Sequence, residues 1–110
     1  LIGACSIIIT SLKNRKAFIG YCFNKGYWNN GYATEAASAL LDLGFSKLNL
    51  HRIYATCDKR NIGSKKVLEK IGMKQEGLMR EDKIIDNEWR DSYLYSILEQ
   101  EYESERGNFT

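Results

Sequence analysis

The apolar residues at the start of the chain form two short runs that have the composition of β-strands. Residues 1–10 (LIGACSIIIT) are rich in isoleucine, and residues 17–23 (AFIGYCF) form a second apolar run. β-Branched and aromatic residues favour the extended backbone of a strand. The polar residues 11–16 predict a turn between the two runs. Because this connection is short, we expect the two strands to be antiparallel neighbours.

A helical pattern follows over residues 31–47, after a polar loop at residues 24–30. Apolar or small residues recur there every three or four positions, at Ala33, Ala36, Ala37, Leu40, Leu41 and Gly44. This spacing places them on one face of a helix, whereas Thr34, Ser38 and Asp42 share the opposite face. Because the residues of the apolar face are small near its start, we expect the helix to lie close to a sheet.

The second half of the chain predicts a strand, a short helix and a hairpin. Residues 51–58 have strand character, and either Asp58 or Asn61 could cap a helix over residues 62–71. We expect the apolar positions Val67, Leu68 and Ile71 to face inward, and Gly72 to end the helix. Residues 73–84 and 88–98 then form two long predicted strands, joined at Asp86 and Asn87, which favour tight hairpin turns.

The predicted order of elements is β-β-α-β-α-β-β, with no repeats and no linker. This order is typical of a mixed α/β (α+β) fold in which the helices pack on one sheet. The 110 residues are enough for one domain with one hydrophobic core. We assign the domain to residues 1–98. Residues 99–110 alternate glutamate with polar residues, and we expect this acidic C-terminal tail to be frayed.

Composition and charge narrow the class of function. Hydrophobic residues make up 44% of the chain and charged residues 27%, an ordinary mixture for a soluble globular protein. No apolar run approaches the ~18–20 residues of a membrane span. Residues 1–98 carry 15 basic and 10 acidic residues, an excess too mild for a nucleic-acid binder but suited to a small polyanionic ligand. We therefore expect neither a nucleic-acid partner nor a membrane partner.

The first residues and the cysteines indicate the compartment. The chain begins without methionine and without a basic segment, so its start does not resemble a signal peptide, and we expect that the native N-terminus is missing. The three cysteines, at positions 5, 22 and 57, match no zinc or redox spacing. We interpret them as reduced, buried thiols of a cytoplasmic protein, and we expect no metal site.

A strand, a glycine-containing loop and a helix that begins near Gly31 form a unit suited to phosphate binding. Helix N-termini present free N–H groups and a partial positive charge to anions. Gly26 and Gly31 have the spacing of a P-loop, but Tyr32 and Ala33 follow where that motif needs Lys and Ser or Thr. A dinucleotide-binding G-x-G-x-x-G motif is also absent. Nucleotide hydrolysis and dinucleotide redox chemistry are therefore disfavoured.

Residues 27–36 (YWNNGYATEA) resemble motif A of the GNAT superfamily of N-acetyltransferases, and are most similar to its RimJ/RimL-type branch. The family pattern is Gln/Arg-x-x-Gly-x-Gly/Ala. Gly31 and Ala33 match its last two fixed positions, whereas Trp28 stands in place of Gln or Arg. The resemblance continues through residues 50–53, 58–64, 67–73 and 76–77, and covers residues 1–98. The family normally has a further strand and two helices before the position of Leu1, so the resemblance implies an N-terminally truncated domain.

The resemblance implies a reaction and a set of binding residues. GNAT enzymes transfer an acetyl group from acetyl-CoA to a primary amine by direct attack in a ternary complex. Cys22 and Phe23 would lie at a splayed strand end that binds pantetheine and the thioester carbonyl. The pyrophosphate loop would comprise Trp28, Asn29, Asn30, Gly31, Tyr32 and Ala33. Asn61 matches the asparagine that contacts the CoA arm, although it could simply cap a helix. Ser64 matches the residue that protonates the thiolate, although it could be an ordinary first-turn serine.

The resemblance implies that the general base lies on the strand after Glu76 and Gly77. Relatives place a glutamate at the position that is Lys83 here. Glu81 lies on the same side of a regular strand as Lys83, so we prefer Glu81 to Asp82, although either could be a surface carboxylate. The tyrosine acid of other family members would fall at Leu68 and is excluded. We interpret His51 as structural.

Several alternatives stay open. The acceptor could be a small molecule, such as a polyamine, an amino acid or an aminoglycoside-like amine, or it could be a protein N-terminus. A homodimer is also open. From a different class of function, the chain could be a non-catalytic acyl-CoA-binding or interaction module. A third interpretation is a generic phosphate-binding domain.

Overall fold

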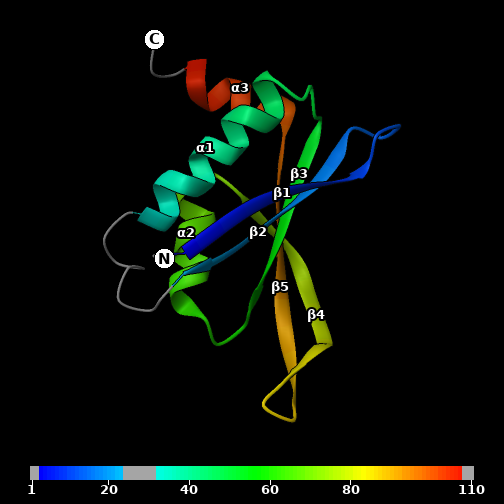
Figure 1. Ribbon diagram of the computed structural model, residues 1–110, viewed down its shortest axis with the longest axis vertical. Coiled ribbons are helices and arrows are strands. Elements are labelled where there is room, and N and C mark those ends of the chain that lie inside the picture. The colour runs from blue at the N-terminus through cyan, green and yellow to red at the C-terminus, as the bar shows by residue number, and fades with distance from the viewer. Residues whose placement is uncertain (1–2, 24–31, 108–110) are drawn as a thin grey trace.

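The computed structural model describes residues 3–23 and 32–107 and shows a mixed α/β fold (Figure 1). In chain order the elements are β1 (Gly3–Ser11), β2 (Lys16–Phe23), α1 (Tyr32–Ser46), β3 (Arg52–Asp58), α2 (Ile62–Lys70), β4 (Lys74–Ile85), β5 (Glu88–Leu98) and α3 (Glu99–Gly107). The five strands form one sheet in the order β1-β2-β3-β5-β4. β2 and β3 are parallel, and the other neighbouring pairs are antiparallel. The predicted order of elements is confirmed, with one further helix at its end.

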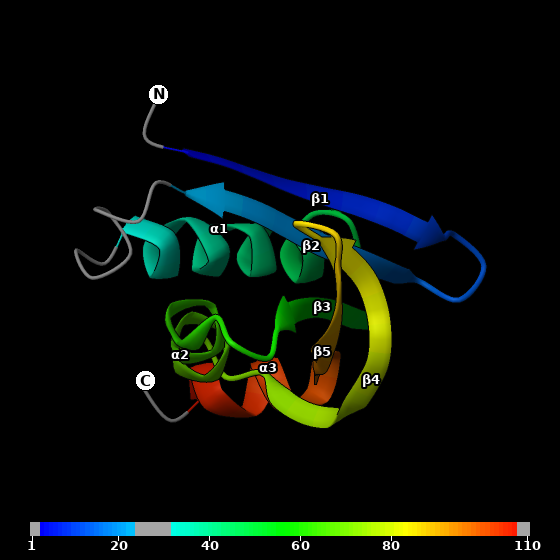
Figure 2. The ribbon, with the colours of Figure 1, turned by 90° about the horizontal axis from the view of Figure 1, so that it is seen from below.

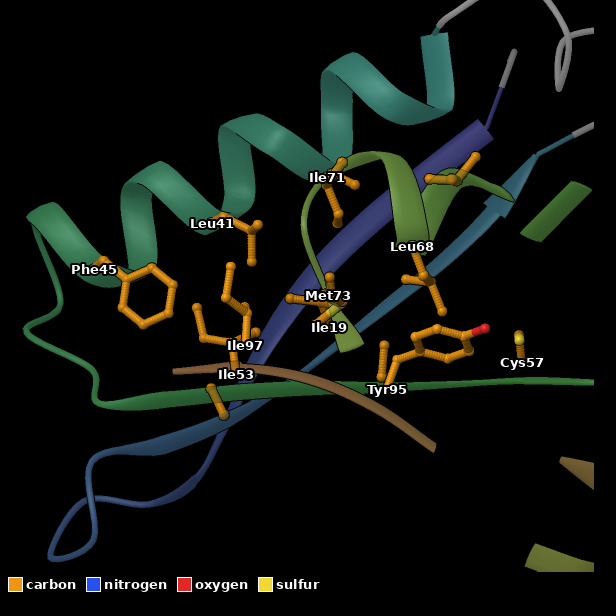
Figure 3. Close-up of a cluster of buried hydrophobic side chains, with 14 of the residues drawn as sticks. Ile19, Leu41, Phe45, Ile53, Cys57, Leu68, Ile71, Met73, Tyr95 and Ile97 are labelled. Atoms are coloured by element: carbon orange, nitrogen blue, oxygen red, sulfur yellow. The ribbon is translucent and has the colours of Figure 1, made fainter. Parts of the chain in front are cut away.

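The hydrophobic core lies between the helices and one face of the sheet. Figure 2 shows α1, α2 and α3 on the same side of the twisted sheet, which curves around them. Along β3 every second residue is buried, as expected for a strand with one face against a core. Figure 3 shows the side chains that fill the core, among them Ile19, Leu41, Phe45, Ile53, Leu68, Tyr95 and Ile97. The face of the second helix predicted to be buried is confirmed by Val67, Leu68 and Ile71.

A glycine lets α1 approach the sheet closely. A Cβ atom added at Gly44 would lie 2.6 Å from Cδ1 of Ile53 and 3.2 Å from Cδ1 of Leu50. Only a residue without a side chain fits this distance without a shift of its neighbours. The expected close contact between helix and sheet is therefore confirmed at Gly44, near the end of α1.

Local signals fix the ends of the later elements as predicted. Gly72, which follows the C-cap residue Ile71 of α2, has φ 96°, a left-handed conformation that favours glycine and ends helices. Asp86 and Asn87 have φ 53° and 61°, which is the geometry of a type I′ hairpin turn. Of the two candidate caps, Asn61 caps α2, because its side chain accepts a hydrogen bond from the N–H group of Ser64.

The expectation of a frayed C-terminal end is wrong for residues 99–107, which form α3. The ring of Tyr102 stacks on Phe45 with 4.8 Å between centroids, and its hydroxyl donates a 2.9 Å hydrogen bond to Asp42 Oδ1. Lys74 forms a 2.5 Å ion pair with Glu101. The packing of the partly buried Tyr102 ring against α1 thus docks a helix whose glutamates, taken alone, favour solvent.

The described residues also bear on the cysteines and on membrane-spanning helices. Cys57 is a free, buried thiol, as expected, and burial raises its pKa. The side chains of the other two cysteines lie outside the described part of the chain. None of the described helices has the length and apolar character needed to cross a membrane.

Candidate active site

The parallel strands β2 and β3 separate after only three paired positions. The last pair is Phe18 with Tyr54, but β2 continues to Phe23 and β3 continues to Asp58. Figure 1 shows the two strands diverging towards their carboxyl ends. Beyond the last pair, the facing edges of the two strands do not hydrogen bond to each other in the described structure. Their N–H and C=O groups are therefore available to a ligand, since a backbone polar group needs a partner.

Two helices begin at the edge of the sheet where the parallel strands β2 and β3 have their carboxyl ends. α1 follows β2 in the chain and α2 follows β3, and the carboxyl ends of parallel strands lie at the same edge of a sheet. α1 and α2 also contact each other. Both helix N-termini are thus directed towards the separated strand ends, where the partial positive charge of a helix N-terminus favours an anion. In open α/β sheets, ligands bind in the crevice at the carboxyl ends of the parallel strands.

The turn from β3 into α2 holds two of the predicted site residues. The N–H group of Asn61 donates to the carbonyl of Asp58 at 2.9 Å. Asn61 Oδ1 in turn accepts a 3.0 Å hydrogen bond from the N–H group of Ser64. Asn61 is exposed, whereas Ser64 is buried at 6% exposure in the first turn of α2. The structure therefore brings Asn61 and Ser64 together at the N-terminus of α2.

The carboxylate of Asp58 organises this turn. Asp58 Oδ1 accepts hydrogen bonds from the N–H group of Arg60 and from Arg90 Nη2, each at 2.7 Å. Burial alone would raise the pKa of Asp58, but the hydrogen bonds from Arg60 and Arg90 outweigh it and hold that pKa below its usual value. Asp58 is therefore ionised at neutral pH. Arg90 comes from β5, 32 residues away in the chain, so no local sequence signal marks it.

Glu81, the preferred candidate base, lies on a β-bulge rather than on a regular strand. The pairing of β4 with β5 jumps from Met79–Ser92 to Lys83–Arg90, so three residues of β4 face one residue of β5. Glu81 has φ 49°, and its N–H group donates to Asp91 Oδ1 at 2.9 Å. The regular alternation by which Glu81 was preferred to Asp82 does not hold in a bulge. Glu81 is exposed and lines an open pocket with Arg80 and Asp91.

One residue of β5 joins the bulge to the turn before α2. Asp91 accepts the Glu81 N–H group with its carboxylate and the Lys59 N–H group with its backbone carbonyl, each at 2.9 Å. The bulge of β4 and the turn between β3 and α2 therefore flank the same residue. Asp91 thus links the element that carries Glu81 to the turn that precedes Ser64.

The remaining predicted residues differ in how far the structure describes them. Trp28, Asn29, Asn30 and Gly31 lie outside the described residues. The backbones of Cys22 and Phe23 end β2, beyond its last pair with β3, and those of Tyr32 and Ala33 begin α1, but their side chains are not described.

His51 lies away from this site. It directly precedes β3, and its Nδ1 atom is 3.4 Å from Glu99 Oε1 at the start of α3. This placement agrees with a structural role. Among the described residues, no three or more His, Cys, Asp or Glu side chains are grouped so that they could hold a metal ion.

Comparison with known proteins agrees with this geometry. The family model described as "Acetyltransferase (GNAT) domain" matches residues 1–74. The Bacillus subtilis (strain 168) protein "Uncharacterized N-acetyltransferase YnaD" is 52% identical over 84 residues, covering 76% of this chain and 49% of that protein. The chain spans about half the length of the curated relatives it matches.

Solved structures give the same picture. A GNAT-family acetyltransferase from Bacillus anthracis superposes with a TM-score of 0.81 and 44% identity, over 91% of this chain and 60% of that one. Mycobacterium smegmatis RimJ in complex with CoA-disulfide superposes with a TM-score of 0.84 and 35% identity, over 92% of this chain and 49% of that one. The mixed α/β architecture predicted from the sequence is thus confirmed as the fold of these acetyltransferases.

Proposed function

Because the chain belongs to the GNAT family of acetyltransferases, we propose that the protein transfers an acetyl group from acetyl-CoA to a primary amine by direct attack in a ternary complex. The observation that carries this proposal is the separation of β2 and β3 after the Phe18–Tyr54 pair, with a helix beginning after each strand. The likeness to RimJ, whose structure contains CoA-disulfide, adds support for the RimJ/RimL-type branch.

The residues at the separated strands suit acetyl-CoA. The open edge of β2 offers backbone N–H and C=O groups that can pair with the amide groups of pantetheine. The N-terminus of α1 suits the pyrophosphate, since helix N-termini bind anions. Exposed Lys59 and Lys66 lie beside the N-terminus of α2 and add positive charge. Asn61 is exposed at the same point and can donate a hydrogen bond through its amide group.

Each candidate residue has a distinct chemical task. Acetyl-CoA supplies the acetyl group as a thioester, whose leaving group is a thiolate. Backbone N–H groups near Cys22 and Phe23 would stabilise negative charge on the thioester carbonyl oxygen. The Ser64 hydroxyl, in the first turn of α2, would donate a proton to the thiolate. Glu81 would take the proton from the attacking amine, directly or through water.

Acetyl-CoA binding is the first test. Isothermal titration calorimetry should detect binding to the wild-type protein, and Gly31→Glu should abolish it by placing a carboxylate in the pyrophosphate loop. Gly77→Glu is the matched control, because a Cβ at Gly77 meets nothing within 4 Å and the added charge is the same. Absence of heat at millimolar acetyl-CoA in the wild type, or unchanged affinity in Gly31→Glu, would contradict the cofactor assignment.

Turnover distinguishes an enzyme from a binding module. A panel of small-molecule amines and peptides with free N-termini should reveal an acceptor. With that acceptor, Ser64→Ala should lower kcat by about 100-fold, the lower end of general acid catalysis, and leave acetyl-CoA affinity unchanged. Ser38→Ala, an exposed serine on α1, serves as the control. Acetyl-CoA binding without turnover on any amine would favour the non-catalytic acyl-CoA-binding module.

A further inference from the structure

We propose that Arg90 and Asp91, two neighbouring residues of β5, are positioning residues for the active site. Arg90 holds the turn that carries Asn61 and Ser64, and Asp91 holds the bulge that carries Glu81. The inference rests on the proposed function, because it assigns these two residues to the support of the candidate catalytic groups. It is carried by a chain of hydrogen bonds in the described structure.

The ion pair of Arg90 with Asp58 is shielded from solvent. The side chain of Arg90 is 17% exposed and that of Asp58 is 11% exposed. A second ion pair, Arg60 with Glu88, lies nearby, but its side chains are 65% and 54% exposed. Ion pairs between exposed groups contribute little, whereas removal of one partner of a buried pair leaves an uncompensated charge. Of these two pairs, only Arg90 with Asp58 can therefore fix a backbone conformation.

The carboxylate of Asp58 depends on Arg90 because only one of its two oxygens accepts hydrogen bonds among the described residues. Among the described residues, Asp58 Oδ2 is buried and has no hydrogen-bond partner. All hydrogen bonds recorded for this carboxylate therefore converge on Oδ1, from the Arg60 N–H group and from Arg90. Without Arg90, a largely buried charge would keep one neutral donor, which favours a rearrangement of the turn.

Two further hydrogen bonds connect Asp58 to Ser64, the candidate general acid. The carbonyl of Asp58 accepts the N–H group of Asn61 at 2.9 Å, and Asn61 Oδ1 accepts the N–H group of Ser64 at 3.0 Å. Each step joins backbone to backbone or side chain to backbone, so a shift of Asp58 displaces both Asn61 and Ser64. Because catalysis needs close alignment, a displacement of about 1 Å can cost about 100-fold in rate.

Asp91 supports the candidate base in the same way. Glu81 has a left-handed backbone, which is unfavourable for a residue with a side chain and needs support from its surroundings. That support is the Asp91 carboxylate, which accepts the Glu81 N–H group at 2.9 Å. The hairpin register, continued from its turn, would place Asp82 opposite Asp91, and like charges directly opposite destabilise a sheet. The bulge replaces that repulsion with a hydrogen bond.

Four variants test the proposal by enzyme kinetics. Arg90→Met should lower kcat by about 10- to 100-fold and also weaken acetyl-CoA binding, because both Ser64 and Asn61 move. Asp91→Ala should lower kcat without weakening acetyl-CoA binding, because its backbone carbonyl still holds Lys59. Arg90→Lys keeps the charge and should fall between Arg90→Met and the wild type. Glu88→Gln, which breaks only the exposed pair with Arg60, should match the wild type.

Amide hydrogen exchange tests the same constraint without turnover. The N–H groups of Arg60 and Ser64 should exchange faster in Arg90→Met and Arg90→Lys, and that of Glu81 faster in Asp91→Ala, with Glu88→Gln unchanged. Unchanged exchange, or wild-type kcat per folded molecule in Arg90→Lys and Asp91→Ala, would overturn the inference. A wild-type protein that fails to bind acetyl-CoA would overturn the proposed function instead. The exchange data would then decide separately whether Arg90 and Asp91 hold the turn and the bulge.

Discussion

Two substitutions of Asn61 can distinguish a residue that only caps a helix from one that also binds acetyl-CoA. Its Oδ1 atom is engaged, because it accepts the Ser64 N–H group at 3.0 Å. Its Nδ2 group is a donor on an exposed side chain. Asn61→Asp keeps the accepting oxygen and removes the donor, whereas Asn61→Ala removes both. The two variants therefore separate the cap from the ligand contact.

The typical energies of a helix cap and of a hydrogen bond set the expected size of each effect. Loss of a helix cap costs about 1 kcal/mol, so Asn61→Ala should lower the Tm by about 4 °C for a domain of this size. Asn61→Asp should be at least as stable as the wild type, because aspartate is an equally good cap and its charge favours a helix N-terminus. Loss of one hydrogen bond to the ligand costs about 0.5–1.5 kcal/mol, or about 2- to 13-fold in Kd. Repulsion between aspartate and the phosphates of acetyl-CoA adds to this loss.

The assay combines thermal unfolding with calorimetric titration of acetyl-CoA. Asn61→Asp should have at least the wild-type Tm and a weaker affinity, and Asn61→Ala should lose both stability and affinity. Asn14→Asp, the same change in the exposed turn at the amino end of β2, is the control for added negative charge. Wild-type affinity in Asn61→Asp would show that Asn61 is only a cap. A Tm of Asn61→Asp as low as that of Asn61→Ala would refute the capping argument itself.

Two further predictions concern stability. Burial, reinforced by the charge of Glu69, raises the pKa of Tyr95 from 10.0 to about 12. The neutral phenol therefore contributes its full stability below pH 10, and this contribution is lost as the pH rises towards 12. Urea unfolding at a series of pH values should show this loss, and it should diminish in Tyr95→Phe; an identical pH dependence in that variant would refute the assignment. Tyr102→Phe keeps the ring on Phe45 but loses the hydrogen bond to Asp42, and should lower the free energy of unfolding by about 0.5–1.5 kcal/mol. Tyr102→Ala should cost more in the same unfolding measurement, and a Tyr102→Ala variant as stable as the wild type would show that α3 is not docked through this ring.

Periodicity and local turn chemistry were enough to predict most of the secondary structure. The helical face of α1, the hairpin turn at Asp86 and Asn87 and the end of α2 at Gly72 depend on residues close together in the chain. Such features follow from backbone sterics and from side-chain spacing, both of which can be counted along a sequence. The resemblance of residues 27–36 and 58–64 to a known family then indicated where the site would lie.

Other features depend on contacts between distant residues. Alternation along a regular strand favoured Glu81, but the bulge of β4 is fixed by its pairing with β5 and removes that alternation. The ordered α3 depends on Tyr102, which bonds to a residue 60 positions earlier. Neither the bulge nor the docked helix has a signal within its own segment. Both arise from packing and pairing that exist only after the chain has folded.

The sequence by itself therefore determined the elements from β1 to β5 and their order, and its family resemblance predicted a class of site. Those properties are set by local backbone preference and by the apolar pattern that one buried face requires. Only the tertiary structure decided how far β2 and β3 pair before they separate, and that Arg90 reaches Asp58 at the turn before α2. Sheet register and a shielded ion pair are settled by the free energy of the whole packed chain, because each joins segments that the sequence leaves far apart.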